Sequence, residues 1–457
     1  MPSEQTLPRD PSDPGDPSAP LAPDAGSLRP TATLPIGHLI RISMYWLGLT
    51  AIDGAVGLFN QNRLNFGPLA VDPTEVGRIL FLLSIPVAVI SIAIQPTVGA
   101  ISDYTTSRWG RRKPYIVIGS LLDVVFLIGI AFSSSILMLG AFAALLAFST
   151  NIARGPFQGY VPDLVPDHQV GLASAMVGLM QVLGNVIGFA LVTIAVSVLH
   201  QIELAIIAVA VVELVTMIAV VARVGEGQPP KPRNGRSWRS IAREAWGTDV
   251  LKERSYVWLL ASRFFFLMGG AMLVNLIITY LKQTHHLGEA AANETNFVIL
   301  IVIVVANVVA IVPSAKLSDR IGRKPVIYAS CLIGGIGVTM AALADTVGWA
   351  IVGGALFGAS AGTFLAVDWA LMTDIIPKAS SGRYMGLSNV ATTSSTVIAV
   401  ATGGLLLDAV NIALGQGTGP RAAYLLGAAY YVVAAITLRP VVEPPRRVRR
   451  AAGIPTG

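Results

Sequence analysis

The chain has 457 residues and a formal net charge of +6, and 53% of its residues are hydrophobic while only 13% are charged. A soluble domain carries about 25% charged residues, and a mean hydropathy of +0.66 is too apolar for a soluble globule of this length. The composition therefore excludes a soluble domain and predicts a polytopic membrane protein. The single cysteine, Cys331, excludes an intrachain disulfide and a cysteine-ligated metal cluster.

The N-terminal segment, residues 1–36, differs in composition from the rest of the chain. Its first 35 residues contain nine prolines and almost no large apolar side chains. Such a segment cannot bury enough surface to offset the entropy lost on ordering. We therefore expect a disordered tail over residues 1–36.

From residue 37 on, apolar runs alternate with short polar breaks. A run of about 20 apolar residues crosses the hydrocarbon core as a helix, because the backbone must satisfy its own hydrogen bonds in lipid. The sequence thus predicts an all-α membrane protein with twelve transmembrane helices. The runs are 38–60, 76–100, 113–133, 135–156, 171–199, 202–223, 256–281, 294–314, 325–343, 347–371, 383–408 and 421–439.

The long hydrophilic break 224–255 divides the twelve runs into six and six. We expect an N-terminal six-helix bundle over 37–223, a linker over 224–255 and a C-terminal bundle over 256–440, followed by a tail over 441–457. The linker contains the stretch "SWRSIAREAW", whose spacing is typical of a short amphipathic helix on a membrane surface.

The lysines and arginines predict the orientation. Of 32 such residues, 27 fall on the side of the N-terminus and four on the opposite side when successive loops alternate. Because basic loops stay inside the cell, both termini are expected in the cytoplasm of a plasma-membrane protein. These basic residues face lipid headgroups, and the charge therefore gives no reason to expect a nucleic-acid partner.

Two charged loops have nearly the same pattern about 210 residues apart. The first is "GAISDYTTSRWGRRKP" at 99–114, and the second is "AKLSDRIGRKP" at 315–325. A second pair of matching motifs follows these loops. "DLVPDHQVG" begins at Asp163, 53 residues after Gly110, and "DIIPKASSG" begins at Asp374, 52 residues after Gly322. Two matched motifs at matched spacing predict that the two six-helix halves are structural repeats.

The loop residues predict a gate on the cytoplasmic side. An aspartate at the end of a helix can pair with an arginine of the neighbouring loop or with the N-terminus of a helix in the other half, and glycine permits the tight turn. Such contacts can hold that side shut, and they must break for it to open. The predicted gate residues are Gly99, Asp103, Arg108, Gly110, Arg111, Arg112, Asp163, Asp319, Arg320, Gly322, Arg323 and Asp374.

These loops resemble the signature of the major facilitator superfamily, G-x-x-x-D-R-x-G-R-[KR]. The second copy fits the short form, with Ala315 in place of the first glycine, and the first copy has four extra residues. The longer form, "IQPTVGAISDYTTSRWGRRKPYI", is similar to the sucrose-transporter and glycoside:cation symporter branch, as is "GPFQGYVPDLVPDHQVGLASAMVGLMQVLGNVIG" at 155–188. The superfamily resemblance covers roughly residues 38–440, and the branch resemblance covers about 60 residues.

The resemblance implies a secondary active transporter that works by alternating access, with two repeated halves around one site. We expect proton-coupled symport of a sugar or glycoside by a monomer, with a proton-driven antiporter that exports drugs or metabolites as the alternative. The chain has no Gly-Lys-Ser or Gly-Lys-Thr P-loop for ATP, no nucleophile elbow and no metal-ligand spacing. We therefore expect neither an enzyme nor a cofactor.

Four acids within the predicted helices qualify as intramembrane groups, and such an ionisable group is costly and is functional or paired. By the resemblance, the first, fourth, seventh and tenth helices line the substrate pathway, so that Asp53 and Asp368 face it. Asp53, Asp368 and Asp123 are the predicted proton-coupling or substrate acids, with an internal salt bridge or hydrogen bond as the alternative for each. For Glu213 we expect the internal contact.

Amides, an arginine and tryptophans inside the helices are candidates for contact with sugar hydroxyls, although amides in membranes also bond helices together. Gln181 and Asn185 share one helix face because they are four residues apart. We expect Arg263 to extend toward the cytoplasmic end of its helix. The substrate-lining candidates are Trp46, Asn60, Asn151, Arg154, Gln181, Asn185, Asn275 and Trp369.

Overall fold

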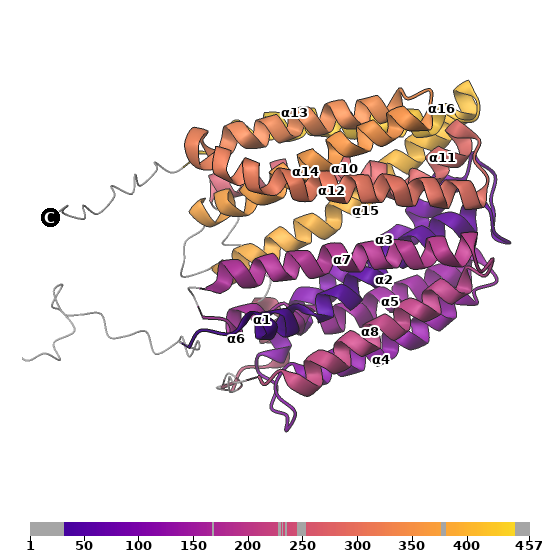
Figure 1. Ribbon diagram of the computed structural model, residues 1–457. Helices are drawn as coiled ribbons and strands as arrows, with labels where there is room; N and C mark the ends of the chain where they lie inside the picture. The colour runs from indigo at the N-terminus through magenta and orange to yellow at the C-terminus, as the bar shows by residue number, and fades with distance from the viewer. Residues whose placement is uncertain are drawn as a thin grey trace, which may run out of the picture.

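The computed structural model describes residues 32–166, 169–226, 230, 232–233, 235–244, 253–375 and 381–443. These residues form sixteen α-helices, and no strand occurs among them. Twelve segments are long and apolar enough to cross a membrane. The expected all-α architecture is therefore confirmed (Figure 1).

The first group of helices precedes the linker. It comprises α1 (Ile36–Ser43), α2 (Tyr45–Asn65), α3 (Val76–Ser102), α4 (Lys113–Ala131), α5 (Ile136–Phe157), α6 (Tyr160–Leu164), α7 (Val170–Ser197) and α8 (Glu203–Arg223). Helices α1 and α2 together make the first span, and α5 and α6 together make the fourth. The side chain of Ser135 caps α5 by accepting a hydrogen bond from the Met138 N–H.

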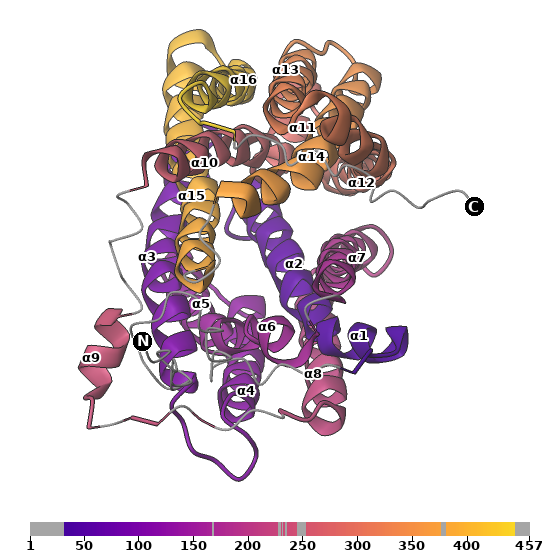
Figure 2. The same cartoon turned by 90° about the vertical axis from the view of Figure 1, so that its left-hand side faces the viewer.

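The second group follows the short linker helix α9 (Trp238–Glu244). It comprises α10 (Arg254–Asn275), α11 (Ile277–His285), α12 (Glu289–Ile321), α13 (Arg323–Ala342), α14 (Val347–Ile375), α15 (Ser381–Leu414) and α16 (Thr418–Leu438). Helix α9 lies within the stretch that the sequence predicted to be a short helix, and it packs beside α3 (Figure 2).

Some boundaries differ from the predicted runs. Helix α2 continues through a polar stretch to Asn65, and α12 extends to Ile321 at the loop motif. The predicted seventh run is broken at Leu276, which separates α10 from α11. Hydropathy misses the extension of α2 because its polar side chains bond protein partners rather than facing lipid, as Asn62 bonds Asn293 and Asn65 bonds Thr279.

Both groups pack their helices in the same pattern. In the first group α2 contacts α7 and α8, while α5 contacts α3 and α4; in the second group α10 contacts α15 and α16, while α14 contacts α12 and α13. The groups meet where α3 contacts α15 and where α7 contacts α12. Viewed along the helices, the second group lies above the first (Figure 2). The repeat predicted from the loop motifs is thus present in the packing.

The loops lie at two opposite ends of the molecule, which we call the basic end and the far end. The basic end holds the charged loops 103–112 and 322, and it is on the left in Figure 1. The far end holds the loops 66–75 and 286–288. Between these ends, many large apolar side chains on the outside are exposed, as expected for a surface in contact with lipid; examples are Val89, Val309 and Leu332.

Candidate functional site

An ion pair lies inside the first group. Asp53 on α2 accepts a hydrogen bond of 2.7 Å from Nη2 of Arg154 on α5. The Asp53 side chain is 48% exposed although it lies midway along a span whose apolar window is two-thirds buried. A carboxylate with that exposure in the middle of a helix bundle can exchange a proton with water and can contact a polar ligand.

The face of α2 that carries Asp53 is open on the side that follows it along the helix. One turn further, a Cβ built on Gly57 would meet nothing within 4 Å. Asn60 follows on the same face, and its buried Oδ1 has no hydrogen-bond partner among the described atoms. Trp46, two turns before Asp53, is half-buried and packs on Phe157 with ring centroids 5.7 Å apart.

Helix α7 borders this face. Gln181 and Asn185 are both half-buried, and Asn185 donates to the Gln181 backbone carbonyl at 3.2 Å. The Asn185 backbone lies so close to α2 that a Cβ on Gly54 would approach its carbonyl oxygen to 3.1 Å. The two predicted amides therefore lie beside the α2 helix that carries the ion pair.

In the described part of the structure, three other predicted substrate-lining residues make no hydrogen bond to the ion pair of Asp53 and Arg154. Asn151 is buried, and its Nδ2 donates to Ser91 Oγ at 2.9 Å and to the Ala147 carbonyl at 2.7 Å, so both of its amide hydrogens are used. Asn275 is half-buried near the end of α10 and donates to its own helix. Trp369 lies on α14, and its side chain is outside the described part of the structure.

A second ion pair lies inside the second group. Asp368 on α14 is 1% exposed and accepts a hydrogen bond from Arg263 on α10. Arg263 is 7% exposed and also donates to Thr392 on α15 at 3.3 Å. The expectation that Arg263 extends toward the end of its helix is wrong, because a buried carboxylate opposite it offers a better partner than the headgroup region.

The two ion pairs occupy equivalent helices with their charges exchanged. Helix α2 corresponds to α10, and α5 corresponds to α14, by the packing pattern given above. The acid is on α2 in the first pair, and the base is on α10 in the second. The pairs also differ in burial, because Asp53 is half-exposed and Asp368 is not.

The other two intramembrane acids lie together in the first group. Asp123 and Glu213 are fully buried on α4 and α8. Asp123 accepts from Thr150 at 2.9 Å and from Ser149, while Glu213 accepts from Tyr45 at 3.1 Å. The internal hydrogen bond expected for Glu213 is present.

Several predicted gate residues form one network at the basic end. Arg112 donates to Asp103 at 2.8 Å and to Asp163 at 2.9 Å, and Arg111 also pairs with Asp163. Both arginine side chains are more than nine-tenths buried. Gly99 faces the Gly155 backbone, and the close approach here depends on Gly155, where a Cβ would lie 2.4 Å from the Gln95 carbonyl oxygen.

Glu226 completes this network, although the sequence analysis did not identify it. Its carboxylate accepts from the backbone N–H groups of Arg112 and Lys113, at the start of α4, and from the Tyr160 hydroxyl at 3.0 Å. A carboxylate at a helix N-terminus is stabilised by the free N–H groups and the helix dipole. Gly110 is required beside it, because its φ is +113° and a Cβ would lie 2.4 Å from Glu226 Oε2.

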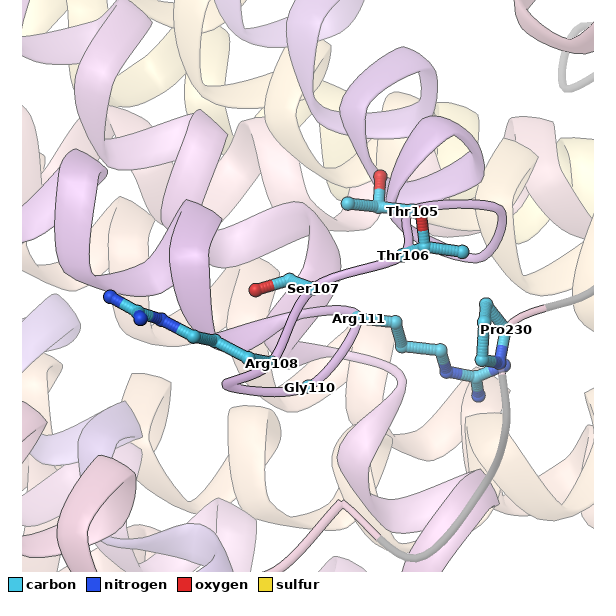
Figure 3. Close-up of a pocket in the computed structure, with 7 residues that line it drawn as sticks. All are labelled: Thr105, Thr106, Ser107, Arg108, Gly110, Arg111 and Pro230. Atoms are coloured by element: carbon cyan, nitrogen blue, oxygen red, sulfur yellow. The ribbon is translucent and has the colours of Figure 1, made fainter.

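The turn of this loop borders a cavity of about 500 Å³. Figure 3 shows the Arg111 side chain directed toward Pro230, while Arg108 extends away on the other side of the turn. Arg108 is exposed, and its place in the gate stays a prediction. The lining residues are Thr105, Thr106, Ser107, Arg108, Gly110, Arg111 and Pro230.

The equivalent loop of the second group has a similar carboxylate cap. Glu443 accepts from the backbone N–H of Arg323 at 2.9 Å and from that of Lys324 at 3.4 Å, and the preceding Gly322 has a φ of +112°. Arg323 also donates to Ser318 at 2.8 Å. Arg320 is exposed on α12. The side chains of two further predicted gate residues are outside the described part: Asp319 and Asp374.

Glu226 and Glu443 were detectable in the sequence. Glu226 follows Arg223 by three residues after the sixth run, and Glu443 follows Arg439 by four residues after the twelfth. Alignment of the two halves beyond the loop motifs would therefore have paired these glutamates.

Hydrogen bonds between the two groups gather at the far end. Asn62 and Asn293 exchange two amide hydrogen bonds of 3.0 and 2.6 Å, and Asn65 donates to Thr279 at 3.0 Å. Lys282 donates to the Asn65 carbonyl, and partial burial lowers the pKa of the Lys282 ammonium. These bonds connect α2 to α11 and α12, so the end of α2 is held against the second group.

A carboxylate makes a further connection at this end. Asp408 on α15 accepts from the backbone N–H groups of Gly77 at 2.9 Å and Arg78 at 2.5 Å, at the start of α3. The two helices touch here through glycines, because a Cβ on Gly77 would lie 1.9 Å from the Gly404 carbonyl oxygen. No sequence pattern predicts this role for Asp408, since its partners are backbone groups of a distant helix.

Two repeated groups of six spans each, with an ion pair inside each group, define a polytopic α-helical membrane protein. The family model described as Major Facilitator Superfamily matches residues 39–306 and 259–454. This chain therefore belongs to the Major Facilitator Superfamily, which is a family of membrane transporters. The resemblance indicated by the loop motifs is confirmed.

Curated relatives match part of the chain. Sucrose transport protein SUT1 of Oryza sativa subsp. japonica is 31% identical over 122 residues, which cover 21% of this chain and 22% of the rice protein. Sucrose transport protein SUC3 of Arabidopsis thaliana is 31% identical over 120 residues, which cover 21% of this chain and 20% of that protein. The match thus spans about a fifth of the length of these relatives.

Solved structures match almost the whole chain in fold. The crystal structure of a D-xylose-proton symporter has a TM-score of 0.68 at 16% identity and covers 89% of this chain and 98% of that one. The crystal structure of the nucleoside transporter NupG has a TM-score of 0.64 at 11% identity and covers 89% and 98%. At such identities the likeness concerns the fold alone.

Proposed function

We propose that this protein is a proton-coupled symporter of a sugar or glycoside that works by alternating access, with Asp53 and Arg154 as the coupling pair. The observation that carries the proposal is the half-exposed Asp53 carboxylate, 2.7 Å from Arg154, in the middle of a membrane span. Its support from sequence is the similarity of about a fifth of the chain to sucrose transport proteins.

The ion pair provides a physical basis for coupling. When Asp53 takes up a proton, the attraction to Arg154 is lost and the guanidinium becomes free to bind another acceptor. Since Asp53 is on α2 and Arg154 is on α5, the proton changes a contact between two helices that the resemblance places on the substrate pathway. Protonation thereby alters the relative free energies of the conformations.

Sugar recognition would use the side chains around Asp53. Asn60 offers a buried carbonyl oxygen without a partner in the described part, and Trp46 offers an aromatic face. Gln181 and Asn185 add amides from α7. We propose that these groups and the Asp53 carboxylate bind hydroxyls in the space beside Gly57.

We further propose that the two groups are rigid bodies joined by the linker and that the basic end is cytoplasmic. The distribution of 27 basic residues against four supports this orientation at the plasma membrane. Contacts between the groups at the far end then describe a conformation closed toward the outside. Asp53 would be reached by water from the cytoplasm in this state.

The test is uptake into proteoliposomes with an imposed inward proton gradient and a panel of radiolabelled mono- and disaccharides. The wild type is compared with Asp53→Asn, which keeps the shape of the side chain but cannot titrate, and with Asp72→Asn, which alters an exposed acid in the 66–75 loop. Wild type and Asp72→Asn should accumulate a sugar, and Asp53→Asn should not.

Two results would contradict the proposal. Accumulation that persists in Asp53→Asn at the wild-type level would remove Asp53 from coupling. No uptake of any sugar, together with proton-driven movement of cationic dyes, would favour a drug or metabolite antiporter instead. Counterflow of the labelled sugar without a gradient separates the two roles of Asp53, since a variant deficient only in coupling still exchanges substrate.

A further inference from the structure

Two carboxyl groups are buried against each other between α4 and α8. Asp123 and Glu213 have no exposed surface and lie on two helices in contact, where the Tyr45 hydroxyl bonds Glu213 and lies 2.6 Å from Ser120, one turn before Asp123. The two carboxyls are near enough to act on each other electrostatically. Asp123 Oδ1 and Glu213 Oε1 accept hydrogen bonds from hydroxyl groups. The remaining oxygens, Asp123 Oδ2 and Glu213 Oε2, accept no hydrogen bond among the described residues. A proton shared by the two carboxyls would give both of these oxygens a hydrogen bond.

The groups around this pair leave its charge largely uncompensated. The direct donors are the neutral hydroxyls of Ser149, Thr150 and Tyr45, and Tyr45 also lies 2.6 Å from Ser120. The titratable or charged groups that face the pair from the neighbouring helices are Tyr45 on α2 and Arg154 on α5. Arg154 acts on Asp123 without a hydrogen bond to it, because its Nη2 is bonded to Asp53. Two adjacent anions in this setting would repel each other at low dielectric, whereas a shared proton leaves a single charge.

We propose that Asp123 and Glu213 bind one proton between them and form a second proton-binding site that communicates with Asp53 through Arg154. The existence of the site depends only on the buried carboxyl pair. The communication between the sites rests on the proposed function, in which Asp53 takes up a proton from the gradient.

Arg154 is positioned to sense both sites. It is one helical turn, about 6 Å along α5, from Thr150, whose hydroxyl donates to Asp123. On its other side Arg154 bonds Asp53 at 2.7 Å. When Asp53 is protonated, the guanidinium charge is no longer neutralised and acts fully on the carboxyl pair. That charge disfavours the shared proton, so protonation of Asp53 lowers the affinity of Asp123 and Glu213 for the proton they share.

Infrared difference spectroscopy of the purified protein tests the site without any substrate. A protonated carboxyl has a C=O stretching band that an ionised one lacks, and the band is followed as a function of pH. The wild type should show a buried carboxyl band at neutral pH, and the double variant Asp123→Asn/Glu213→Gln should lose it. A double variant that keeps the full wild-type band would overturn the proposal.

Two further variants keep the test informative if the double variant does not fold. Tyr45→Phe removes the hydroxyl that bonds Glu213 but leaves both acids in place, so it should shift the frequency of the band. A band that Tyr45→Phe does not move would not belong to this pair. Asp53→Asn imitates protonated Asp53 and should lower the midpoint of the band by about one pH unit or more, which is a tenfold loss of proton affinity.

The Asp53→Asn result decides the communication between the sites. A midpoint that stays at the wild-type value would overturn it, even if the band itself belongs to Asp123 and Glu213. Since the spectra need no sugar, a failure of sugar uptake is separate from a failure of this site. An unchanged band in the double variant would contradict the second site while leaving sugar symport through Asp53 intact.

Discussion

The carboxylate of Asp408 on α15 accepts a 2.9 Å hydrogen bond from the backbone N–H of Gly77, at the first turn of α3. Its second oxygen accepts from the next N–H, that of Arg78. The bonds connect the two helix groups at the far end, and Asp408 is only 6% exposed. A carboxylate suits this position because free N–H groups and the helix dipole both favour a negative charge there.

Replacement of Asp408 by Asn should open the far end more often. Asn keeps one acceptor but loses the charge. The closed form then loses about 1.5 kcal/mol of stabilisation, which raises the population of the open form roughly tenfold. The measurement is the rate of maleimide labelling of Thr279→Cys, a buried position at the contact with α2, in a Cys331→Ala background. Asp345→Asn is the control, since Asp345 is an exposed acid at the same end that pairs with Arg421. Equal labelling rates in Asp408→Asn and Asp345→Asn would contradict a closing role for Asp408.

The second prediction concerns the buried pair of Arg263 and Asp368. Removal of one partner leaves a buried charge without compensation, which costs about 3–5 kcal/mol. Arg263→Met and Asp368→Asn should therefore each lower the midpoint of unfolding in detergent strongly. The double variant should recover much of the loss, because neither charge then remains.

The matched comparison for this pair is Arg154 and Asp53. Their carboxylate is half-exposed, so water can compensate it, and Arg154→Met should lower the unfolding midpoint less than Arg263→Met. An additive loss in the Arg263→Met/Asp368→Asn double variant would show that the two residues do not stabilise each other.

The sequence was sufficient to predict the membrane-spanning helices and the repeat, but not to predict where each helix begins and ends. Apolar runs fix the number of spans, because lipid requires a continuous apolar surface. Hydropathy could not predict that α2 continues to Asn65, since Asn62 and Asn65 are polar side chains that bond the other helix group. Nor could it place the break at Leu276, where neither proline nor glycine marks the change of direction.

The residues of the candidate site were likewise predictable from the sequence only in part. Asp53 and Arg154 were both identified, because a charge inside an apolar run is conspicuous in sequence. Their partnership was not, and Arg263 was assigned wrongly, because its partner is 105 residues away on another helix. The role of Asp408 could not be predicted, since its partners are backbone N–H groups, which leave no trace in a sequence pattern.

The third prediction concerns pH and His285, at the end of α11 outside the spans. Burial, followed by the nearby charges of Arg421 and His286, lowers the pKa of His285 below its usual value of 6.5, and its ring bonds the Tyr280 hydroxyl at 2.9 Å. Above pH 6.5 the ring is neutral in both the folded and the unfolded chain, so its titration does not change the free energy of unfolding. Below it, the unfolded chain binds the proton more readily, so stability falls as the pH falls.

His285→Gln should reduce this acid sensitivity. The measurement is the difference between the unfolding midpoints at about pH 8 and about pH 5, which should be smaller in the variant than in the wild type. His200→Asn is the control, because His200 is exposed and Asn tolerates its φ of +53°. If both variants keep the wild-type difference, another group causes the acid sensitivity.

The last prediction concerns Gly110 and Glu226 at the basic end. Gly110→Ala places a Cβ at a φ of +113°, which costs about 1–2 kcal/mol, and 2.4 Å from the Glu226 carboxylate, which must then leave the start of α4. Gly415→Ala isolates the first effect, since Gly415 has a φ of +95° and no atom within 4 Å of the added Cβ. Gly110→Ala should thus lower the unfolding midpoint more than Gly415→Ala does.

A double-mutant cycle separates the clash with Glu226 from the backbone strain at Gly110. In a Glu226→Ala background the carboxylate is absent, so the cost of Gly110→Ala should fall to that of Gly415→Ala. The Glu226→Ala variant alone should be destabilised by about 1–3 kcal/mol, because the N–H groups of Arg112 and Lys113 lose a charged acceptor. If Gly110→Ala costs the same with and without Glu226, the carboxylate does not hold the start of α4 in solution, and the arginine network with Asp103 and Asp163 must position the loop by itself.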